Sequence, residues 1–186
     1  MESASRASVD VRKIPSATQR AMPVVPFETL PDSSRVWVFG TDKPLTDDAT
    51  TALLDQVDRY LVDWKAHGAE LTVARKWRDG RFLVVAVNQS TAGATGCSID
   101  GLFRLLQDTE KQIAVNLVGG GRVFYRDDHA AVQSVSRAGV DALVANETIT
   151  KHTVVFDTTL TDLGTWRACF ERRAKDTWVK ELLPAS

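Results

Sequence analysis

The sequence predicts an α+β domain with a β-α-β-β-α-β core, the ferredoxin-like split βαβ, and a C-terminal β/α extension. Three observations predict it. Apolar residues alternate over residues 35–40, an Asp79-Gly80 turn joins two further strand patterns, and helical apolar spacing occurs on both sides of that hairpin. This order favours an antiparallel sheet with two helices on one face.

The first half of the core begins with RVWVFG (residues 35–40), which is rich in β-branched and aromatic residues and predicts a strand. Thr46 is a good N-cap for the helix that follows, and Gly68 supplies its stop directly after His67. The inward positions of this helix recur at helical spacing and are Leu53, Leu54, Val57, Leu61 and Trp64. Residues 71–77 alternate again, so we expect the second strand there.

The second half of the core begins with residues 81–88, which are apolar on both faces and predict a central strand. Ser98 is the expected N-cap of the second helix, and Gly119–Gly121 ends that segment before a fourth strand at 123–126. The buried stripe of the second helix is Ile99, Leu102, Phe103, Leu106 and Ile113. The extension is predicted as strands at 131–135 and 152–157, helices at 136–145 and 161–170, and a docked segment at 178–183.

We expect one domain over residues 26–186, preceded by a disordered tail over residues 1–25. A chain of 186 residues buries roughly 70% of its unfolded surface, so it needs no metal or disulfide to fold. The serines, threonines and arginines of the tail follow neither a helical nor a strand period. Met22 is therefore a reasonable alternative start.

Composition excludes several function classes. The net charge of −1 gives no electrostatic footprint for nucleic acid, so a nucleic-acid partner is unlikely, despite a local basic cluster at Arg167, Arg172, Arg173 and Lys175. No stretch approaches 18 apolar residues, so no membrane partner is expected. Two cysteines without CxxC spacing and three histidines favour a reducing cytoplasm and no metal site. The sequence identifies no cofactor.

The best candidate site is the glycine-rich loop between the predicted central strand and the second helix. Gly93 and Gly96 let backbone N–H groups approach an anion, and the helix N-terminus adds free donors and a positive dipole end. In this hypothesis Ser98 caps and donates, and Asp100 orients. We expect a small anionic ligand or a partner segment at residues 93–100. The alternative is that the glycines only permit the turn from strand to helix.

Cys97 supports a second hypothesis, a thiol-dependent enzyme or redox sensor, because a helix start favours the thiolate. His67 is the only tempting base, but the junctions that carry the two residues need not adjoin in the predicted fold. The simpler interpretation of Cys97 is a small buried apolar residue. Trp64 and Trp77 could form a ligand platform, although aromatic residues at such spacing are more often core. The sequence leaves open whether any reaction is catalysed.

A third hypothesis is a protein-interaction module. A ferredoxin-like sheet has one face that its two helices leave uncovered, and such faces often pair in dimers or are covered by additional elements. The sequence therefore allows a homodimer that forms through the sheet face.

Four segments carry a resemblance to a known family: PFETLPDSSRVWVFG (26–40), WKAHG (64–68), TGCSID (95–100) and TVVFD (153–157). Over residues 26–183 they resemble a family of small uncharacterised bacterial proteins often labelled "ABC transporter ATPase". This sequence contains no Walker A motif and no ABC signature, so we do not expect P-loop ATP hydrolysis. The resemblance implies no stated activity. It implies that the marked positions matter, namely Trp64, His67, Gly68, Gly96, Cys97, Ser98 and Asp100.

Overall fold

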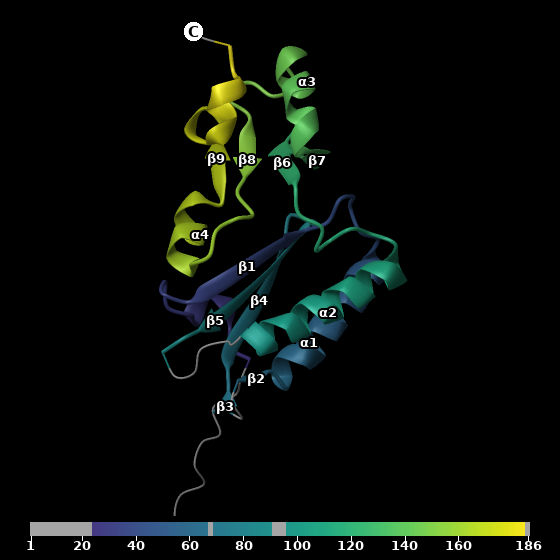
Figure 1. Ribbon diagram of the computed structural model, residues 1–186, viewed down its shortest axis with the longest axis vertical. Coiled ribbons are helices and arrows are strands. Elements are labelled where there is room, and N and C mark those ends of the chain that lie inside the picture. The colour runs from purple at the N-terminus through teal and green to yellow at the C-terminus, as the bar shows by residue number, and fades with distance from the viewer. Residues whose placement is uncertain (1–23, 67–68, 91–95, 185–186) are drawn as a thin grey trace, which may run out of the picture.

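The computed structural model describes residues 24–66, 69–90 and 96–184. Within them the chain is α+β, with its two larger sheets antiparallel throughout. Figure 1 shows two parts one above the other along the long axis: the first sheet with α1 and α2 lies below, and the second sheet with α3 lies above. No helix of the described part is long and apolar enough to cross a membrane.

The first sheet has the order β1-β5-β4, with strands Arg35–Gly40, Phe82–Asn88 and Thr72–Arg78. The prediction of a central third strand is confirmed, because β5 pairs with both neighbours and is buried from Phe82 to Val87. The hairpin turn falls at Asp79-Gly80, where both residues have positive φ (54° and 63°). Such φ values characterise the type I′ turns that match the twist of antiparallel strands.

Two helices cover one face of this sheet. Helix α1 (Asp47–Val62) starts at Thr46, whose side chain accepts a hydrogen bond from the Ala49 N–H at 3.2 Å, as its cap role predicts. Helix α2 (Gly96–Ile113) lies beside α1, and Gln56 of α1 contacts Thr109 and Gln112 of α2. The helices and the sheet enclose a core that includes Leu53, Val57, Leu61, Leu102 and Leu106. A two-stranded ribbon, β2 (Lys65–Ala66) with β3 (Ala69–Glu70), follows α1.

The second sheet has the order β7-β6-β8-β9, with strands Val132–Ser136, Arg122–Arg126, Val154–Phe156 and Glu171–Arg173. Its remaining elements are the helices α3 (Val140–Ala145) and α4 (Leu163–Cys169) and the 3₁₀ turns η2 (Arg137–Gly139), η3 (Ala174–Asp176) and η4 (Trp178–Leu182). A further 3₁₀ turn, η1 (Phe27–Thr29), precedes β1. The predicted docking of residues 178–183 is observed, because Val179 is buried beside Val140 and Ile149.

The order of elements follows the ferredoxin-like prediction as far as α2 and then departs from it. The predicted fourth strand, β6, pairs with β7 and β8 and not with β1. Both faces of β6 are apolar: Phe124 lies on one face, while Val123 and Tyr125 lie on the other and pack against the α3 side. A strand of this kind needs cover on both faces. Phe82 of the first sheet covers Phe124, and Val140 and Val179 cover the other face. Within the described residues, the outer edge of β1 forms backbone hydrogen bonds only with residues 161–163, at its beginning.

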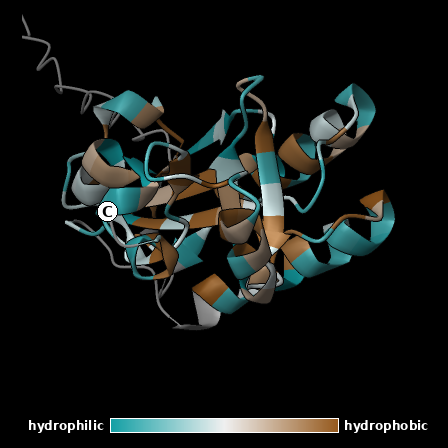
Figure 2. Ribbon diagram, turned by 90° about the horizontal axis from the view of Figure 1, so that it is seen from above, coloured by the Kyte–Doolittle hydropathy of each residue, from teal (hydrophilic) through white to brown (hydrophobic). Residues whose placement is uncertain are grey.

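A shared core joins the two sheets. It contains Phe82 and Val84 of β5, Phe124 of β6, Phe156 of β8 and Phe170. The Phe82 ring lies 5.0, 4.9 and 5.0 Å from the rings of Phe124, Phe156 and Phe170. Figure 2 shows the hydrophobic segments gathered in the middle of the molecule and hydrophilic segments on the outer helices. The face of the first sheet opposite α1 and α2 is therefore covered by the chain itself.

The predicted tail over residues 1–25 needs a correction at its end. Val24 forms a parallel bridge with Val73, and the Val25 N–H donates to the Val73 carbonyl at 2.9 Å. These two residues thus belong to the fold, because they cover the outer edge of β4. Residues 1–23 lie outside the described part.

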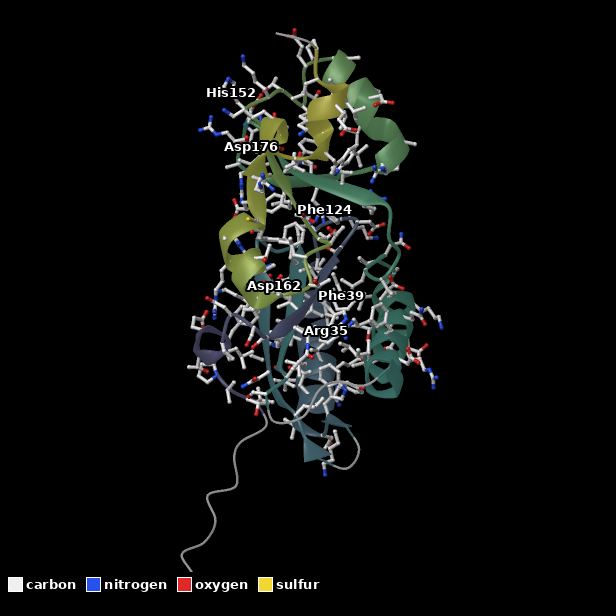
Figure 3. The ribbon with its side chains drawn as sticks, turned by 60° about the vertical axis from the view of Figure 1, so that its left-hand side comes forward. Arg35, Phe39, Phe124, His152, Asp162 and Asp176 are labelled. Carbon is white, nitrogen blue, oxygen red and sulfur yellow. The ribbon has the colours of Figure 1, made fainter. Side chains whose placement is uncertain are left out.

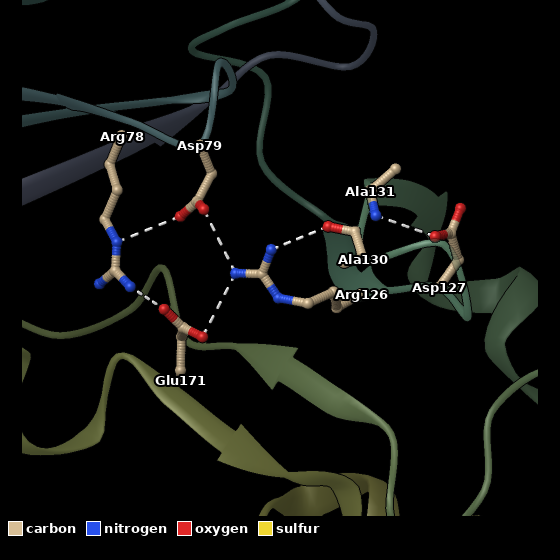
Figure 4. A network of polar contacts seen from close by, with 7 residues as sticks. All are labelled: Arg78, Asp79, Arg126, Asp127, Ala130, Ala131 and Glu171. Carbon is tan, nitrogen blue, oxygen red and sulfur yellow. Dashed lines mark hydrogen bonds and ion pairs between the residues drawn. The ribbon is translucent and has the colours of Figure 1, made fainter.

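An ion-pair network also joins the two sheets, and Figure 4 shows it closely. Arg78 at the end of β4 contacts Asp79 at 3.1 Å and Glu171 of β9. Arg126 of β6 contacts Asp79 at 3.2 Å and Glu171 at 3.3 Å, and donates to the Ala130 carbonyl at 3.0 Å. Each carboxylate thus bridges both guanidinium groups. The network, which we call the hairpin clamp, ties the β4–β5 turn to the second sheet.

Replacing Glu171 by Gln should loosen the hairpin clamp. The side chains of Arg78, Asp79, Arg126 and Glu171 are 32%, 21%, 24% and 30% exposed, so solvent screens them less than an isolated surface pair. We expect Glu171→Gln to lower the free energy of unfolding by about 1 kcal/mol in urea denaturation. The matched control is Asp108→Asn, which breaks the exposed Lys111–Asp108 pair on α2. It should cost at most about 0.3 kcal/mol, and equal losses for the two variants would contradict this role.

Candidate functional site

The structure describes only part of the predicted loop site. Gly93 and His67 lie outside the described residues. Gly96, Cys97 and Ser98 form the first turn of α2, so Ser98 lies inside the helix and is not its N-cap, which corrects the sequence prediction. The helix begins at Gly96, two residues before Ser98. Asp100 is exposed on the same helix.

The ends of α1 and α2 that carry the predicted site lie at the same end of the first sheet. A Cβ built on Gly101 of α2 would lie 2.5 Å from the Tyr60 hydroxyl of α1. The helices run antiparallel, so the segment after Val62 adjoins the first turn of α2 (Figure 1). The sequence left open whether these junctions adjoin, and the described helix ends lie together. Trp64, with 3% of its surface exposed, belongs to the core and lies 5.7 Å from the Tyr60 ring.

A groove of about 910 Å³ runs along the outer edge of β1. One wall consists of the segment after α2, from Leu117 to Gly121, and the other of the segment after β8, from Asp157 to Thr161. The second sheet and its C-terminal segment close one end. Figure 3 shows four residues that border the groove, Arg35, Phe39, Phe124 and Asp176, one above another along the long axis. We call this cavity the edge groove.

Basic side chains outnumber acidic ones in the edge groove. The basic lining residues are Arg35, Arg122, Arg137, Arg172 and Lys180, and the acidic ones are Asp157, Asp176 and Glu181. Five cations minus three carboxylates leave a net charge of +2. None of the five cations forms an ion pair with a carboxylate within the described residues. The groove therefore attracts negatively charged groups.

Two of these arginines are held by aromatic rings. The Arg35 guanidinium lies 4.8 Å from the centroid of the Trp37 ring, and the Arg137 guanidinium lies 4.2 Å from that of Trp178. A guanidinium over an aromatic face is oriented without losing its charge to a carboxylate. All its N–H donors remain able to bind an anion. Arg122 differs, since it donates to Ser134 Oγ at 3.0 Å.

Two carboxylates fix the chain at the borders of the groove. Burial alone would raise the pKa of Asp42, but hydrogen bonds from the Asn116 amide and backbone N–H, helped by the charge of Arg122, hold it below its ordinary value. This contact anchors the segment that leads into Gly119–Gly121. Hydrogen bonds from the Thr165 N–H and side chain lower the pKa of Asp162, which caps α4. Asp162 lies opposite Arg35, where the chain meets the edge of β1.

The Asp162 cap should make stability depend on pH. Because the folded state lowers the pKa of Asp162 below 3.8, its ionised form stabilises the fold above that pH, and this contribution is lost as the pH falls through the folded pKa. The variant Asp162→Asn keeps a capping oxygen but does not titrate. We expect the unfolding free energy of the wild type, relative to Asp162→Asn, to fall between about pH 5 and about pH 2 in urea denaturation. A difference that stays constant over that range would contradict the assignment.

The basic C-terminal cluster found in the sequence does not form one surface. Arg167 contacts Asp32 and donates to the Leu30 carbonyl at 3.0 Å, so it holds the N-terminal segment. Arg172 lines the edge groove, whereas its neighbour Arg173 lies 3.3 Å from His152 Nδ1 and does not line it. The neighbouring aromatic residues Trp166 and Phe170 are buried.

Sequence reasoning did not find the edge groove. Its basic residues come from β1, β6, η2 and β9 and from the C-terminal turn, and no spacing in the sequence connects these segments. The one local signal is Arg35-Val36-Trp37, because residues i and i+2 of a strand share a face, so Arg35 and Trp37 must be neighbours. Residue patterns gave no means to place Arg137 or Arg172 beside them.

Comparison with family models, with curated proteins and with solved structures finds no match for this chain. Function is therefore argued from the geometry of the described residues. The resemblance to the bacterial family remains a proposal.

Proposed function

We propose that this protein binds an anionic ligand in the edge groove. The observation that carries the proposal is the set of five cations without a carboxylate partner along one large cavity. Ligand sites are typically clefts of roughly 300–1,000 Å³ with a few oriented polar groups, and the groove has this size. Carboxylate or phosphate groups fit guanidinium donors best because they accept paired hydrogen bonds.

Different residues of the groove would contact different parts of the ligand. Arg35 and Arg137, oriented by their tryptophans, would contact the anionic groups from the two ends of the groove. Arg172 would add a third donor from β9. The apolar part of a ligand would contact Phe39 and Phe103, whose rings lie 5.4 Å apart and border the groove. This combination favours a ligand with at least two acidic groups on an apolar or extended body.

A thermal-shift titration with citrate and with inorganic pyrophosphate tests the proposal. A ligand at about a hundredfold excess over its Kd stabilises the native state by about 2.7 kcal/mol, which raises Tm by several degrees in a chain of this length. We expect at least one of the two anions to raise the wild-type Tm. Arg172→Gln should then weaken binding by about tenfold, since it removes one charge-assisted contact.

The control lies one residue further along the same strand. Arg173→Gln removes the same charge from β9 but outside the groove, so it should leave the Kd for the anion unchanged within about twofold. Equal weakening by the two variants would show a general charge effect and would reject the groove as the site. Absence of any shift with both anions would reject the proposal of a small anionic ligand.

A thiol-dependent enzyme or redox sensor is a second candidate, and one observation favours it. Tyr60 near the end of α1 lies beside Gly101 near the start of α2, and in the sequence His67 follows the first of these helix ends and Cys97 belongs to the second. Iodoacetamide labelling near neutral pH tests this candidate. Fast labelling of Cys97 that slows in His67→Ala supports a Cys–His pair. Slow labelling in both proteins rejects it.

The homodimer through the sheet face has less support. That hypothesis needs an uncovered face, but Phe27, Leu30, Trp166 and Phe170 pack over the face of the first sheet opposite α1 and α2. A dimer, if it forms, would have to use another surface. The anion site at residues 93–100 and the family resemblance remain proposals.

A further inference from the structure

We propose that the natural occupant of the edge groove is an extended acidic peptide, which adds a strand to the open edge of β1. This inference rests on the proposed function, because it names the ligand class of the same groove. The incoming strand would take the place of the fourth strand in the ferredoxin-like order that the sequence predicts and that β6 does not fill.

The hydrogen-bonding groups of β1 point alternately to the two sides of the strand. Trp37 and Phe39 direct theirs toward β5, in the same parity as Thr41, whose N–H donates to the Arg81 carbonyl. The even-numbered residues direct theirs outward. The outward Val36 N–H donates to the Thr161 carbonyl at 2.9 Å, and the outward Ser34 carbonyl accepts from the Leu163 N–H at 2.8 Å.

Beyond Val36 the outward groups of β1 lack partners. Within the described part of the chain, the carbonyls of Val36 and Val38 accept no hydrogen bond, and the Val38 N–H donates none. Residues 161–163 pair with the first part of the edge, and the chain then turns into α4. An unpaired strand edge is a template for another extended chain. The unpaired groups lie along the edge groove and are spaced for such a chain.

The walls of the groove leave room for a backbone. Gly119, Gly120 and Gly121 line it, and a Cβ built on any of them would meet no atom within 4 Å. A strand lies about 4.8 Å from its neighbour, so this open space beside β1 suits an added strand.

The positive charge of the groove favours a peptide with acidic side chains. The cations of the groove stand at both of its ends, with Arg35 at the start of β1 and Arg137 and Lys180 near the second sheet. A short strand with acidic side chains at alternate positions would direct them to one face. Those carboxylates would then contact the arginines at both ends of the groove, while the main chain of the peptide pairs with Val36 and Val38. Specificity for acidic residues and affinity through the main chain are the two properties expected of this mode.

The test starts from a phage-displayed library of random twelve-residue peptides, selected on the wild-type protein. We expect the recovered peptides to be enriched in Asp and Glu. The best clone, made as a fluorescein-labelled synthetic peptide, is then measured by fluorescence anisotropy against two variants. Val38→Pro removes the N–H of residue 38, which points outward and forms no hydrogen bond with β5. Proline is tolerated on edge strands at such positions. We expect it to weaken peptide binding at least tenfold, and Arg172→Gln to do the same.

Small anions separate the two proposals. Citrate or pyrophosphate binding should be unchanged by Val38→Pro, because neither anion pairs with a strand. Small-anion binding without recovery of any acidic peptide would overturn the peptide and leave the proposed function standing. If neither small anions nor acidic peptides bind, both the inference and the proposed function are overturned. A recovered peptide that binds wild type and Val38→Pro equally would overturn strand addition.

A second measurement does not depend on the folding of Val38→Pro. Two versions of the synthetic peptide are made, one N-methylated at odd-numbered residues and the other at even-numbered residues. Each version therefore loses the N–H donors of one edge of the strand. One version should bind at least tenfold more weakly and the other should bind normally, because only one edge of an added strand faces β1. Equal binding of both versions would overturn the inference even if the proline variant fails to fold.

Discussion

Truncating Phe82 to alanine is expected to lower the free energy of unfolding by about 4 kcal/mol, the largest effect of any substitution proposed for this chain. Phe82 is fully buried, and its ring contacts Phe124 and Phe156 of the second sheet and Phe170 at the end of α4. Its removal leaves a cavity where the two sheets meet. The neighbours cannot close this cavity without moving one sheet against the other, so most of the cavity cost remains.

Urea denaturation followed by tryptophan fluorescence measures this effect. The control is Val62→Ala on α1, where the side chain is 54% exposed and the change should stay within about 0.5 kcal/mol. Phe82→Leu keeps most of the apolar volume and should lose less than half as much as Phe82→Ala. A loss below about 1.5 kcal/mol for Phe82→Ala would show that the two sheets do not share one core.

The second large effect is expected at Gly40, the last residue of β1. A Cβ at this position would lie 2.4 Å from Phe124 Cζ and 2.7 Å from Cε2, so the ring must move. Phe124 is 3% exposed and packs on Phe82, which leaves it little freedom. We expect Gly40→Ala to cost about 1–3 kcal/mol, the usual range for overpacking. The origin is the close approach of the ring.

A double variant isolates that origin. Phe124→Leu shortens the side chain that Gly40→Ala would meet, so the combined loss should be at least about 1 kcal/mol smaller than the sum of the single losses. Gly120→Ala is the matched control, because its Cβ would meet no atom within 4 Å. It should be neutral or slightly stabilising. Additive losses at Gly40 and Phe124 would contradict a steric origin.

Local signals in the sequence predicted the first half of the fold well. The β-branched and aromatic residues of 35–40, the Thr46 cap and the Asp79-Gly80 turn each act within a few residues, and the structure contains the strand, the cap and the turn that they predict. The predicted alternation of β1 is not observed, because Val36 and Phe39 pack into cores on opposite faces. The prediction failed for the strand at residues 122–126, whose position depends on which distant strands it pairs with. Nothing local to residues 122–126 states whether the strand pairs with β1 or with β7 and β8. The strand is apolar on both faces, and in the structure Phe124 packs against the first sheet while Val123 and Tyr125 pack against α3 and the C-terminal turn.

The candidate site was harder to predict than the fold. Glycines before a helix gave a recognisable loop, but the cations of the edge groove come from five separate segments and are brought together by tertiary structure alone. The adjacency of the α1 and α2 ends was also missed. In a split βαβ both junctions lie at the same end of the sheet, and the structure shows this through Tyr60 and Gly101.

The contacts between the two ends of the chain have a consequence for synthesis on the ribosome. Arg167 binds carbonyl groups of residues 27–30 across about 140 positions, and Trp166 and Phe170 cover the face of the first sheet. The strands of that sheet are complete once Asn88 has emerged, yet their apolar cover follows some 80 residues later. At roughly 5–20 residues per second the nascent chain exposes this face for about 4–16 s. During that interval it is a natural client for a chaperone, and a chain terminated before Phe170 would keep the face exposed.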